Sequence, residues 1–141
     1  MKRARFHGVS PYEDAFGFAR AVRVGDVIHV AGTAPIAEPD TQPALDAYGQ
    51  MLRCGEIAGE AIEGLGGSMA DVVRTRMFLV DTADADAVGR AHKEIFGDHE
   101  PAATMVVVAA LLDPTWRVEI EVEAIVSNVR PRSPSRGPIQ V

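Results

Sequence analysis

Apolar and polar residues alternate along several short stretches of this chain, a pattern typical of strands that bury one face. The clearest stretch is RVEIEVEAIV, residues 117–126, in which Glu119, Glu121 and Glu123 alternate with valine, isoleucine and alanine. Because successive side chains of a strand point to opposite faces, the three carboxylates share one face and the small apolar residues share the other. One face of the sheet is therefore predicted to carry a row of negative charges.

The spacing of apolar residues elsewhere predicts five strands and two helices in all. The strands occupy residues 18–33, as a hairpin that turns at Gly25-Asp26, and residues 71–81, 103–112 and 117–126; the helices occupy residues 45–65 and 82–96. Gly55 and Gly59, inside the first helix, are interpreted as points where the helix approaches the sheet closely. The resulting order is β-β-α-β-α-β-β, an α+β domain without internal repeats.

Residues 71–81 are predicted to form a strand with one apolar and one basic face. Val73, Thr75, Met77 and Leu79 share the first face, whereas Arg74, Arg76 and Phe78 share the second. Like charges on a strand repel each other, so cations are expected opposite the three glutamates. The two arginines have the correct parity to meet that need if their strand lies beside residues 117–126.

Two helices cover only one face of a sheet of this size, which leaves the glutamate face uncovered by its own chain. The strand at residues 103–112 is apolar on both faces, because Met105 and Val107 alternate with Thr104, Val106 and Val108. Such a strand is unsuited to a boundary with water. A second copy of the chain is therefore expected to cover this face, which predicts a homo-oligomer.

The chain of 141 residues is expected to form one domain, residues 1–126, followed by a basic tail rich in Pro, Ser and Arg, residues 127–141. The tail carries three arginines and no acidic residue, so the preceding body has a net charge of −9, against −6 for the whole chain. A body this acidic is poorly suited to nucleic acid, whose backbone is bound mainly through Lys and Arg. The tail is predicted to be a flexible, solvated extension.

Other patterns narrow the class of protein. No apolar run approaches the roughly 20 residues of a membrane span, and the basic start MKRARFHGV has no apolar segment behind it, so neither a membrane anchor nor a secretory signal is expected. Cys54 is the single cysteine, which favours a buried thiol in a reducing, cytoplasmic setting. The four histidines lack metal-ligand spacing and no Gly-x-Ser-x-Gly motif occurs, so no metal, cofactor or acyl-enzyme chemistry is expected.

The glutamate row admits two interpretations. In the first it belongs to an interface network of ion pairs with Arg74 and Arg76. In the second, a glutamate that is partly desolvated at a subunit boundary holds a water molecule and moves protons at neutral pH. The residues alone leave both interpretations open.

Four segments together resemble the RidA (YjgF) family, whose older names include endoribonuclease L-PSP. They are RVGDVIHVAGTAPI, GGSMADVVRTRMFLVD, HEPAATMVVVAAL and VEIEVEAIV, in the family's order, and the similarity extends over residues 18–126. The resemblance implies a chorismate-mutase-like α+β fold, with one mixed sheet and two helices on one face. It also implies a homotrimer with ligand clefts between neighbouring subunits.

The resemblance further implies hydrolysis of reactive imines and enamines, such as 2-iminoacids, to a keto acid and ammonia. Glu121 matches the glutamate that places the attacking water in that family, Gly32 and Thr33 match its cleft turn, and Phe18 falls on its tyrosine. Ala103 stands where the family's arginine binds the substrate carboxylate, so this charge-assisted contact is missing.

The missing arginine shifts the expected function. Thr104, the hydroxyl of Thr33, and Arg20 are candidate contacts for a different small ligand. We therefore expect a hydrolase of the deaminase type that acts on small imine or enamine metabolites with an altered substrate range. The alternative is a non-catalytic trimer that binds a small metabolite in the same cleft. A third candidate, a ribonuclease or translation inhibitor, is disfavoured by the acidic body and the lack of a general-base histidine pair.

Overall fold

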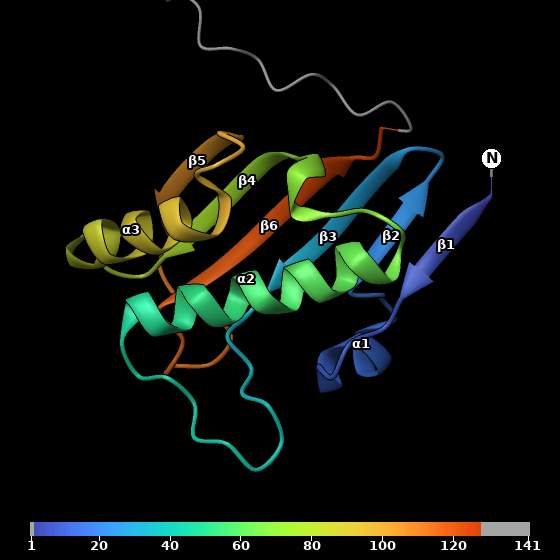
Figure 1. Cartoon of the computed structure of the whole chain (residues 1–141). Helices are drawn as coiled ribbons and strands as arrows, with labels where there is room; N and C mark the ends of the chain where they lie inside the picture. Colours follow the sequence, from blue (N-terminus) through green and yellow to red (C-terminus); the bar gives the residue numbers. More distant parts are fainter. Residues whose placement is uncertain (1, 128–141) are drawn as a thin grey trace, which may run out of the picture.

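The computed structural model describes residues 2–127, which form one six-stranded sheet with two long helices on one face (Figure 1). The strands are β1 (Arg3–Phe6), β2 (Ala21–Val24), β3 (Val27–Thr33), β4 (Val72–Leu79), β5 (Ala102–Val107) and β6 (Val118–Ile125). The helices are α1 (Pro11–Phe16), α2 (Ala47–Gly64) and α3 (Ala85–Phe96), with short 3₁₀ turns η1 (Met69–Asp71) and η2 (Thr82–Asp84). The predicted α+β class is confirmed.

The strands lie in the order β1-β2-β3-β6-β4-β5, so the last strand of the chain is inserted near the middle of the sheet. Neighbouring strands are antiparallel except β4 and β5, which are parallel and joined through α3. A parallel pair requires a crossover connection, and here the second predicted helix supplies it. The sheet is therefore mixed, as expected.

The core lies between β6 and α2. The apolar side of β6, formed by Val118, Ile120, Val122 and Ala124, is completely or almost completely buried. Fully burying one branched side chain contributes roughly 1.5–3 kcal/mol. Cys54 of α2 is buried in the same cluster, where burial raises the pKa of its thiol, so it packs as a small apolar residue. The predicted orientation of β6, apolar side towards the helices, is confirmed.

Two elements at the start of the chain go beyond the predicted order. Strand β1 pairs with β2 at the edge of the sheet, and its mostly exposed sequence RARF gives little periodic signal. Helix α1 begins after Ser10, whose side chain accepts a hydrogen bond from the backbone of Tyr12, and ends at Gly17 with φ of 77°. Six residues are too few to show helical periodicity, so the sequence pattern did not reveal α1.

A β-bulge in β4 overturns one predicted orientation. Val72 and Arg74 pair with consecutive residues of β6, which leaves Val73 as an extra residue in the strand. Val73 is 42% exposed, whereas Val72 is buried. The prediction that Val73 faces the core is therefore wrong, while the next three residues on that predicted face are buried as expected.

Gly55 and Gly59 do not bring α2 close to the sheet as predicted. A Cβ atom on Gly55 would lie 2.6 Å from Cδ1 of Ile95 in α3, and one on Gly59 would lie 3.4 Å from Sδ of Met69. The two glycines therefore allow α3 and η1 to approach α2 on its outer side.

No helix among residues 2–127 is long and apolar enough to cross a lipid bilayer. The predicted tail falls outside the described residues except for Ser127, and its flexibility stays a prediction, as does the domain boundary at residue 126.

Candidate functional site

Strand β6 presents its three glutamates on the face of the sheet opposite the core. In the ladder with β4, Glu119 lies beside Phe78, Glu121 beside Arg76 and Glu123 beside Arg74. Arginines on the adjacent strand therefore face the glutamate row, as the parity of residues 71–81 predicted. The three carboxylates nevertheless have different surroundings.

Glu123 is held by an ion pair. Its Oε1 atom lies 3.1 Å from Nη1 of Arg76, which donates a hydrogen bond to it, and 3.9 Å from Nδ1 of His29. Both the arginine and the glutamate side chains are about one third exposed, so the pair adds at most about 1 kcal/mol to stability. Glu123 and Arg76 fit the interpretation of a charge network.

Glu119 lies against the end of β3. Its Oε2 atom is 3.0 Å from the position that a Cβ on Gly32 would occupy, so a side chain at position 32 would press against this carboxylate and shift it slightly. Burial raises the pKa of Glu119 above the usual glutamate value; the charge of Arg20 opposes this shift, and that of Glu121 adds to it. Glu119 is thus partly desolvated, the property that the sequence led us to expect of a reactive carboxylate.

The side chain of Glu121 makes no hydrogen bond or ion pair within residues 2–127, and neither does that of Glu119, which lies against Gly32 and near the charge of Arg20. Glu121 faces a hollow of about 240 Å³ on the open face of the sheet. The hollow is also lined by Ala19, Val22, His29, Val30, Ala31 and Glu123. A water molecule occupies about 30 Å³ in the liquid, so this space is large enough for a small ligand with accompanying water.

Four of the predicted site residues, Phe18, Arg20, Gly32 and Thr33, gather at the end of β3 beside this hollow. The Arg20 side chain is 3% exposed; its Nη1 donates hydrogen bonds to the Gly32 carbonyl at 2.8 Å and to Thr33 Oγ1 at 3.3 Å, and its guanidinium lies 5.4 Å from the centre of the Phe18 ring. The ladder between β3 and β6 shifts register between Val30 and Thr33. Arg20 therefore fixes an irregular strand end.

The same contacts limit what Arg20 and Thr33 offer to a ligand. Thr33 is fully buried, and its hydroxyl donates to the Ala31 carbonyl at 2.8 Å while accepting from Arg20. The Thr33 hydroxyl and Nη1 of Arg20 are thus engaged inside the chain. Their predicted contact with a ligand stays a prediction, and Gly32 is the member of this group that lies against Glu119.

Glu13 is a buried charge that the sequence interpretation missed. It is 4% exposed, accepts a hydrogen bond from the backbone of Gly8 at 2.9 Å, and places Oε2 3.7 Å from Nε of Arg20. Among the described residues neither of these last two atoms has a hydrogen-bond partner. The spacing of Ser10 and Glu13 matches a helix-capping signature, which could have drawn attention to Glu13.

Strand β5 places Ala103 and Thr104 on opposite faces of the sheet. Ala103 lies beside Thr75, which is buried on the helix side, whereas Thr104 lies beside Arg76 on the glutamate side. Thr104 Oγ1 accepts a hydrogen bond of 2.8 Å from Nη2 of Arg74. One chain therefore does not bring position 103 and Glu121 to the same face.

Comparison with known proteins settles the family. Residues 11–126 match the family described as endoribonuclease L-PSP. The chain belongs to this RidA/YjgF family. Its curated relatives include an uncharacterized Streptomyces coelicolor protein, 42% identical over 120 residues that cover 85% of this chain and 90% of the relative. The Acinetobacter baylyi protein named 3-aminoacrylate deaminase RutC is 30% identical over 104 residues, 73% of this chain and 82% of the relative.

Solved structures of the RidA/YjgF family share the fold. Rv2704 from Mycobacterium tuberculosis, a member of the YjgF/YER057c/UK114 family, superposes with a TM-score of 0.81 at 35% identity, over 89% of this chain and all of that one. Yeast Mmf1 superposes with a TM-score of 0.75 at 18% identity, over 89% and 100%, which shows the fold alone. The expected chorismate-mutase-like α+β fold is confirmed.

Proposed function

We propose that this chain is a deaminase-type hydrolase of small reactive imines or enamines, with a substrate range that differs from that of relatives carrying an arginine at position 103. Membership of the RidA/YjgF family and the similarity to a protein named as a 3-aminoacrylate deaminase support the reaction type. The observation that carries the proposal is the unpartnered carboxylate of Glu121 at a hollow of ligand size.

Glu121 has the chemistry that imine hydrolysis requires. A water molecule in the hollow donates a hydrogen bond to the carboxylate, which takes a proton as the water oxygen bonds to the imine carbon. The carboxyl group returns this proton to the nitrogen, and the hydroxyl group of the tetrahedral intermediate supplies the second proton. The carbon–nitrogen bond breaks as the carbonyl forms, ammonia leaves, and Glu121 is again a carboxylate. Because Arg76 is paired with Glu123, the Glu121 carboxylate stays available to accept this proton.

The charges near the site favour substrates without a carboxylate. Ala103 supplies no cation. Arg20 is paired with the buried Glu13 and Arg76 with Glu123, whereas Arg74 donates to the neutral hydroxyl of Thr104. An anionic substrate would therefore meet a row of three glutamates, and of these three arginines Arg74 alone is not bound to a carboxylate. Neutral imines or enamines are therefore the substrate class we expect.

We propose that the active form is a homotrimer whose cleft combines two copies of the chain. Position 103 and Glu121 lie on opposite faces within one chain, so a site that uses both needs a neighbouring subunit. The glutamate face carries no helix in Figure 1, which leaves it free for such a neighbour. The single buried thiol, Cys54, fits the reducing cytoplasm as the place of action.

The test compares the parent with Glu121→Gln on freshly generated imines, with ammonia release as the readout. The panel pairs a neutral imine with a carboxylate-bearing one of similar size. The parent should hydrolyse the neutral imine at least as fast as the anionic one. Loss of the proton acceptor should lower the catalysed rate by roughly 10²- to 10⁴-fold. Asp40→Asn, which removes an exposed carboxylate that does not line the hollow, is the matched control.

Equal rates for the parent and Glu121→Gln would sink the catalytic proposal. If those equal rates match the uncatalysed background while small molecules still bind, the protein is a non-catalytic metabolite-binding trimer. The site does not support the alternative of a ribonuclease, because a row of glutamates repels the phosphate backbone of RNA.

A further inference from the structure

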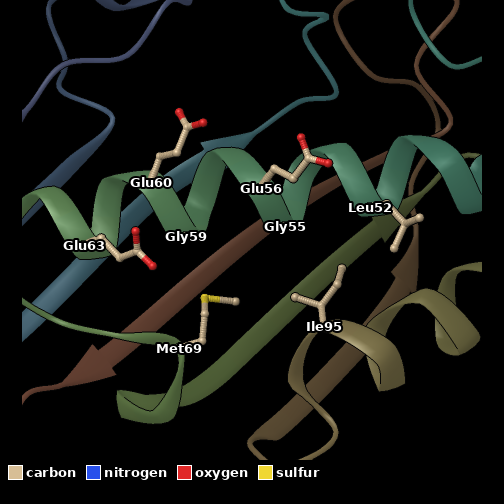
Figure 2. Close-up of a pocket in the computed structure, with 8 residues that line it drawn as sticks. All are labelled: Leu52, Gly55, Glu56, Gly59, Glu60, Glu63, Met69 and Ile95. Atoms are coloured by element: carbon tan, nitrogen blue, oxygen red, sulfur yellow. The ribbon is translucent and has the colours of Figure 1, made fainter.

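A second concave surface lies on the helix side of the molecule, away from the Glu121 hollow. It is a groove of about 580 Å³ between α2, α3 and η1 (Figure 2). Its floor is formed by Leu52, Gly55, Gly59, Met69 and Ile95, and its rim by Glu56, Glu60 and Glu63. The groove is thus apolar at the bottom and acidic along one side.

The groove exists because α2 carries glycines where it passes α3 and η1. At Gly55 the side chain of Ile95 occupies the space of a missing Cβ, and at Gly59 the nearest heavy atom to that position is Sδ of Met69, 3.4 Å away. The surface of α2 therefore has a depression between its three glutamates on one side and α3 and η1 on the other. An extended segment with small or apolar side chains fits such a channel.

The acidic rim is only partly neutralised by positive charges of the described residues. Glu56, Glu60 and Glu63 follow one another at steps of four and three residues, so they lie along one side of α2 and repel each other. Arg53 pairs with Glu56 at 3.1 Å. Neither Glu60 nor Glu63 has an ion-pair partner among residues 2–127. Two adjacent carboxylates beside an apolar floor are the complement of a basic segment with apolar residues.

The described part of the chain ends next to this groove. Val126 packs at the end of α2, because its Cγ2 atom lies 3.3 Å from the position of a Cβ on Gly67, which Ile62 also approaches. The backbone of Val126 is fixed there by a hydrogen bond to Asp26. Glu63 lies in the last turn of the same helix. The described chain therefore ends near the end of the groove that Glu63 marks.

Residues 128–141 have the length and composition to occupy the groove. Fourteen residues reach at most about 46 Å when extended, whereas the α2 segment from Leu52 to Glu63 is about 17 Å long. Their sequence, NVRPRSPSRGPIQV, contains three arginines, no acidic residue and two branched apolar residues close to its end. Its charge and apolar content complement the rim and the floor respectively.

We propose that residues 128–141 bind in the groove of their own chain, with arginines against Glu60 and Glu63 and the apolar end on the floor near Ile95. The proposal is independent of the catalytic proposal, because the groove and the Glu121 hollow lie on opposite sides of the sheet.

Zero-length crosslinking of the full chain tests this proposal. Arg132→Lys and Arg136→Lys each introduce an amine that a carbodiimide joins to a carboxylate in direct contact, and mass spectrometry identifies the linked peptides. The main product is expected to join the new amine to Glu60 or Glu63. An equal mixture of isotopically labelled and unlabelled chains should give links within one copy. At 1 M salt, where the screening length is about 3 Å, the yield should fall several-fold.

A second variant keeps the test independent of the crosslinker. In Glu60→Gln/Glu63→Gln, trypsin should cut after Arg132 and Arg136 roughly two- to tenfold faster than in the parent, as expected for loss of two exposed ion pairs. Asp14→Asn/Asp40→Asn changes the net charge equally at exposed sites outside the groove and should leave the rate unchanged. Dominant links to other acids, links between copies, or equal cleavage in the parent and the groove variant would each overturn the proposal.

Discussion

Glu119 lies close to the buried guanidinium of Arg20, yet the pKa of its carboxyl is raised, because burial outweighs the attraction. The ionised form of this residue is therefore disfavoured in the fold. Glu121, two residues further along the same face, lies open at the hollow, and Glu123 is tied to Arg76. Neighbouring residues of one type thus have different surroundings, which follow from what the adjacent strands place beside them.

The raised pKa of Glu119 has a consequence for stability that depends on pH. Between the ordinary value of 4.5 and the higher value in the fold, the folded protein holds more protons than the unfolded chain. The contribution of Glu119 to the free energy of unfolding of the parent must therefore fall as pH rises through this interval. Glu119→Gln cannot titrate there, so its stability relative to the parent should increase from about pH 4.5 upward and level off above the folded pKa.

Urea unfolding at a series of pH values measures this difference. Asp40→Asn corrects for the change in net charge, since it removes an exposed carboxylate outside both the hollow and the groove. If the stability of Glu119→Gln runs parallel to that of the parent across the whole series, Glu119 does not have a raised pKa.

At the residue scale, alternation predicted correctly which face the three glutamates share, but not how they differ. Their partners depend on the register of β4 against β6 and on the register shift near Gly32, which join residues far apart in the sequence. No local pattern specifies such pairings. The resemblance to the RidA family singled out Glu121, whereas the burial of Glu119 and Glu13 became visible only in the assembled sheet.

At the scale of the element, two glycine-to-alanine substitutions in α2 test how this helix packs against its neighbours. Both Gly55 and Gly59 lie inside α2, where replacing glycine by alanine gains about 1 kcal/mol of helix stability. At Gly59 the new methyl group would make an ordinary contact with Met69. At Gly55 it would meet three atoms of Ile95 at 2.6 to 3.2 Å and must displace that side chain. Overpacking of this kind costs about 1–3 kcal/mol.

We therefore expect Gly59→Ala to be more stable than the parent by up to about 1 kcal/mol, and Gly55→Ala to be equal to or less stable than the parent. Denaturant unfolding measures the stability of both variants. The midpoints are compared when the unfolding free energy has the same denaturant dependence in each variant and in the parent. An equal gain in the two variants would show that α3 does not pack against α2 at Gly55.

Element prediction succeeded where periodicity was long and failed where it was short. The central strands and both long helices have enough alternating or helical positions to be recognised, with boundaries displaced by only a few residues. Strand β1 and helix α1 have four and six residues, and their formation depends on pairing with β2 and on the Ser10 cap. The bulge at Val73 was equally hidden, because an extra residue changes orientation without changing composition.

At the scale of the molecule, the sheet has one face covered by α2 and α3 and one face left open. On β5, Val106 and Val107 are 41% and 48% exposed, and the outer edge of this strand has no neighbour among the described residues. Exposed apolar residues on an unpaired edge favour association. Sedimentation equilibrium should give a mass about three times the 15.1 kDa of one chain. A single-chain mass at micromolar concentration would contradict the trimer.

The position of Ala103 in the sheet affects how easily this residue can be replaced during evolution. Residue 103 is exposed on an edge strand that is held by one neighbour, so exchanging its side chain disturbs little of the core. Glu121 sits on a strand flanked on both sides, between positions that fill the interior. Under the function proposed above, the fold separates the residue that sets the substrate range from the residue that reacts. On this proposal, a single substitution at the edge of the sheet can change the substrate range while the packing of the core stays the same.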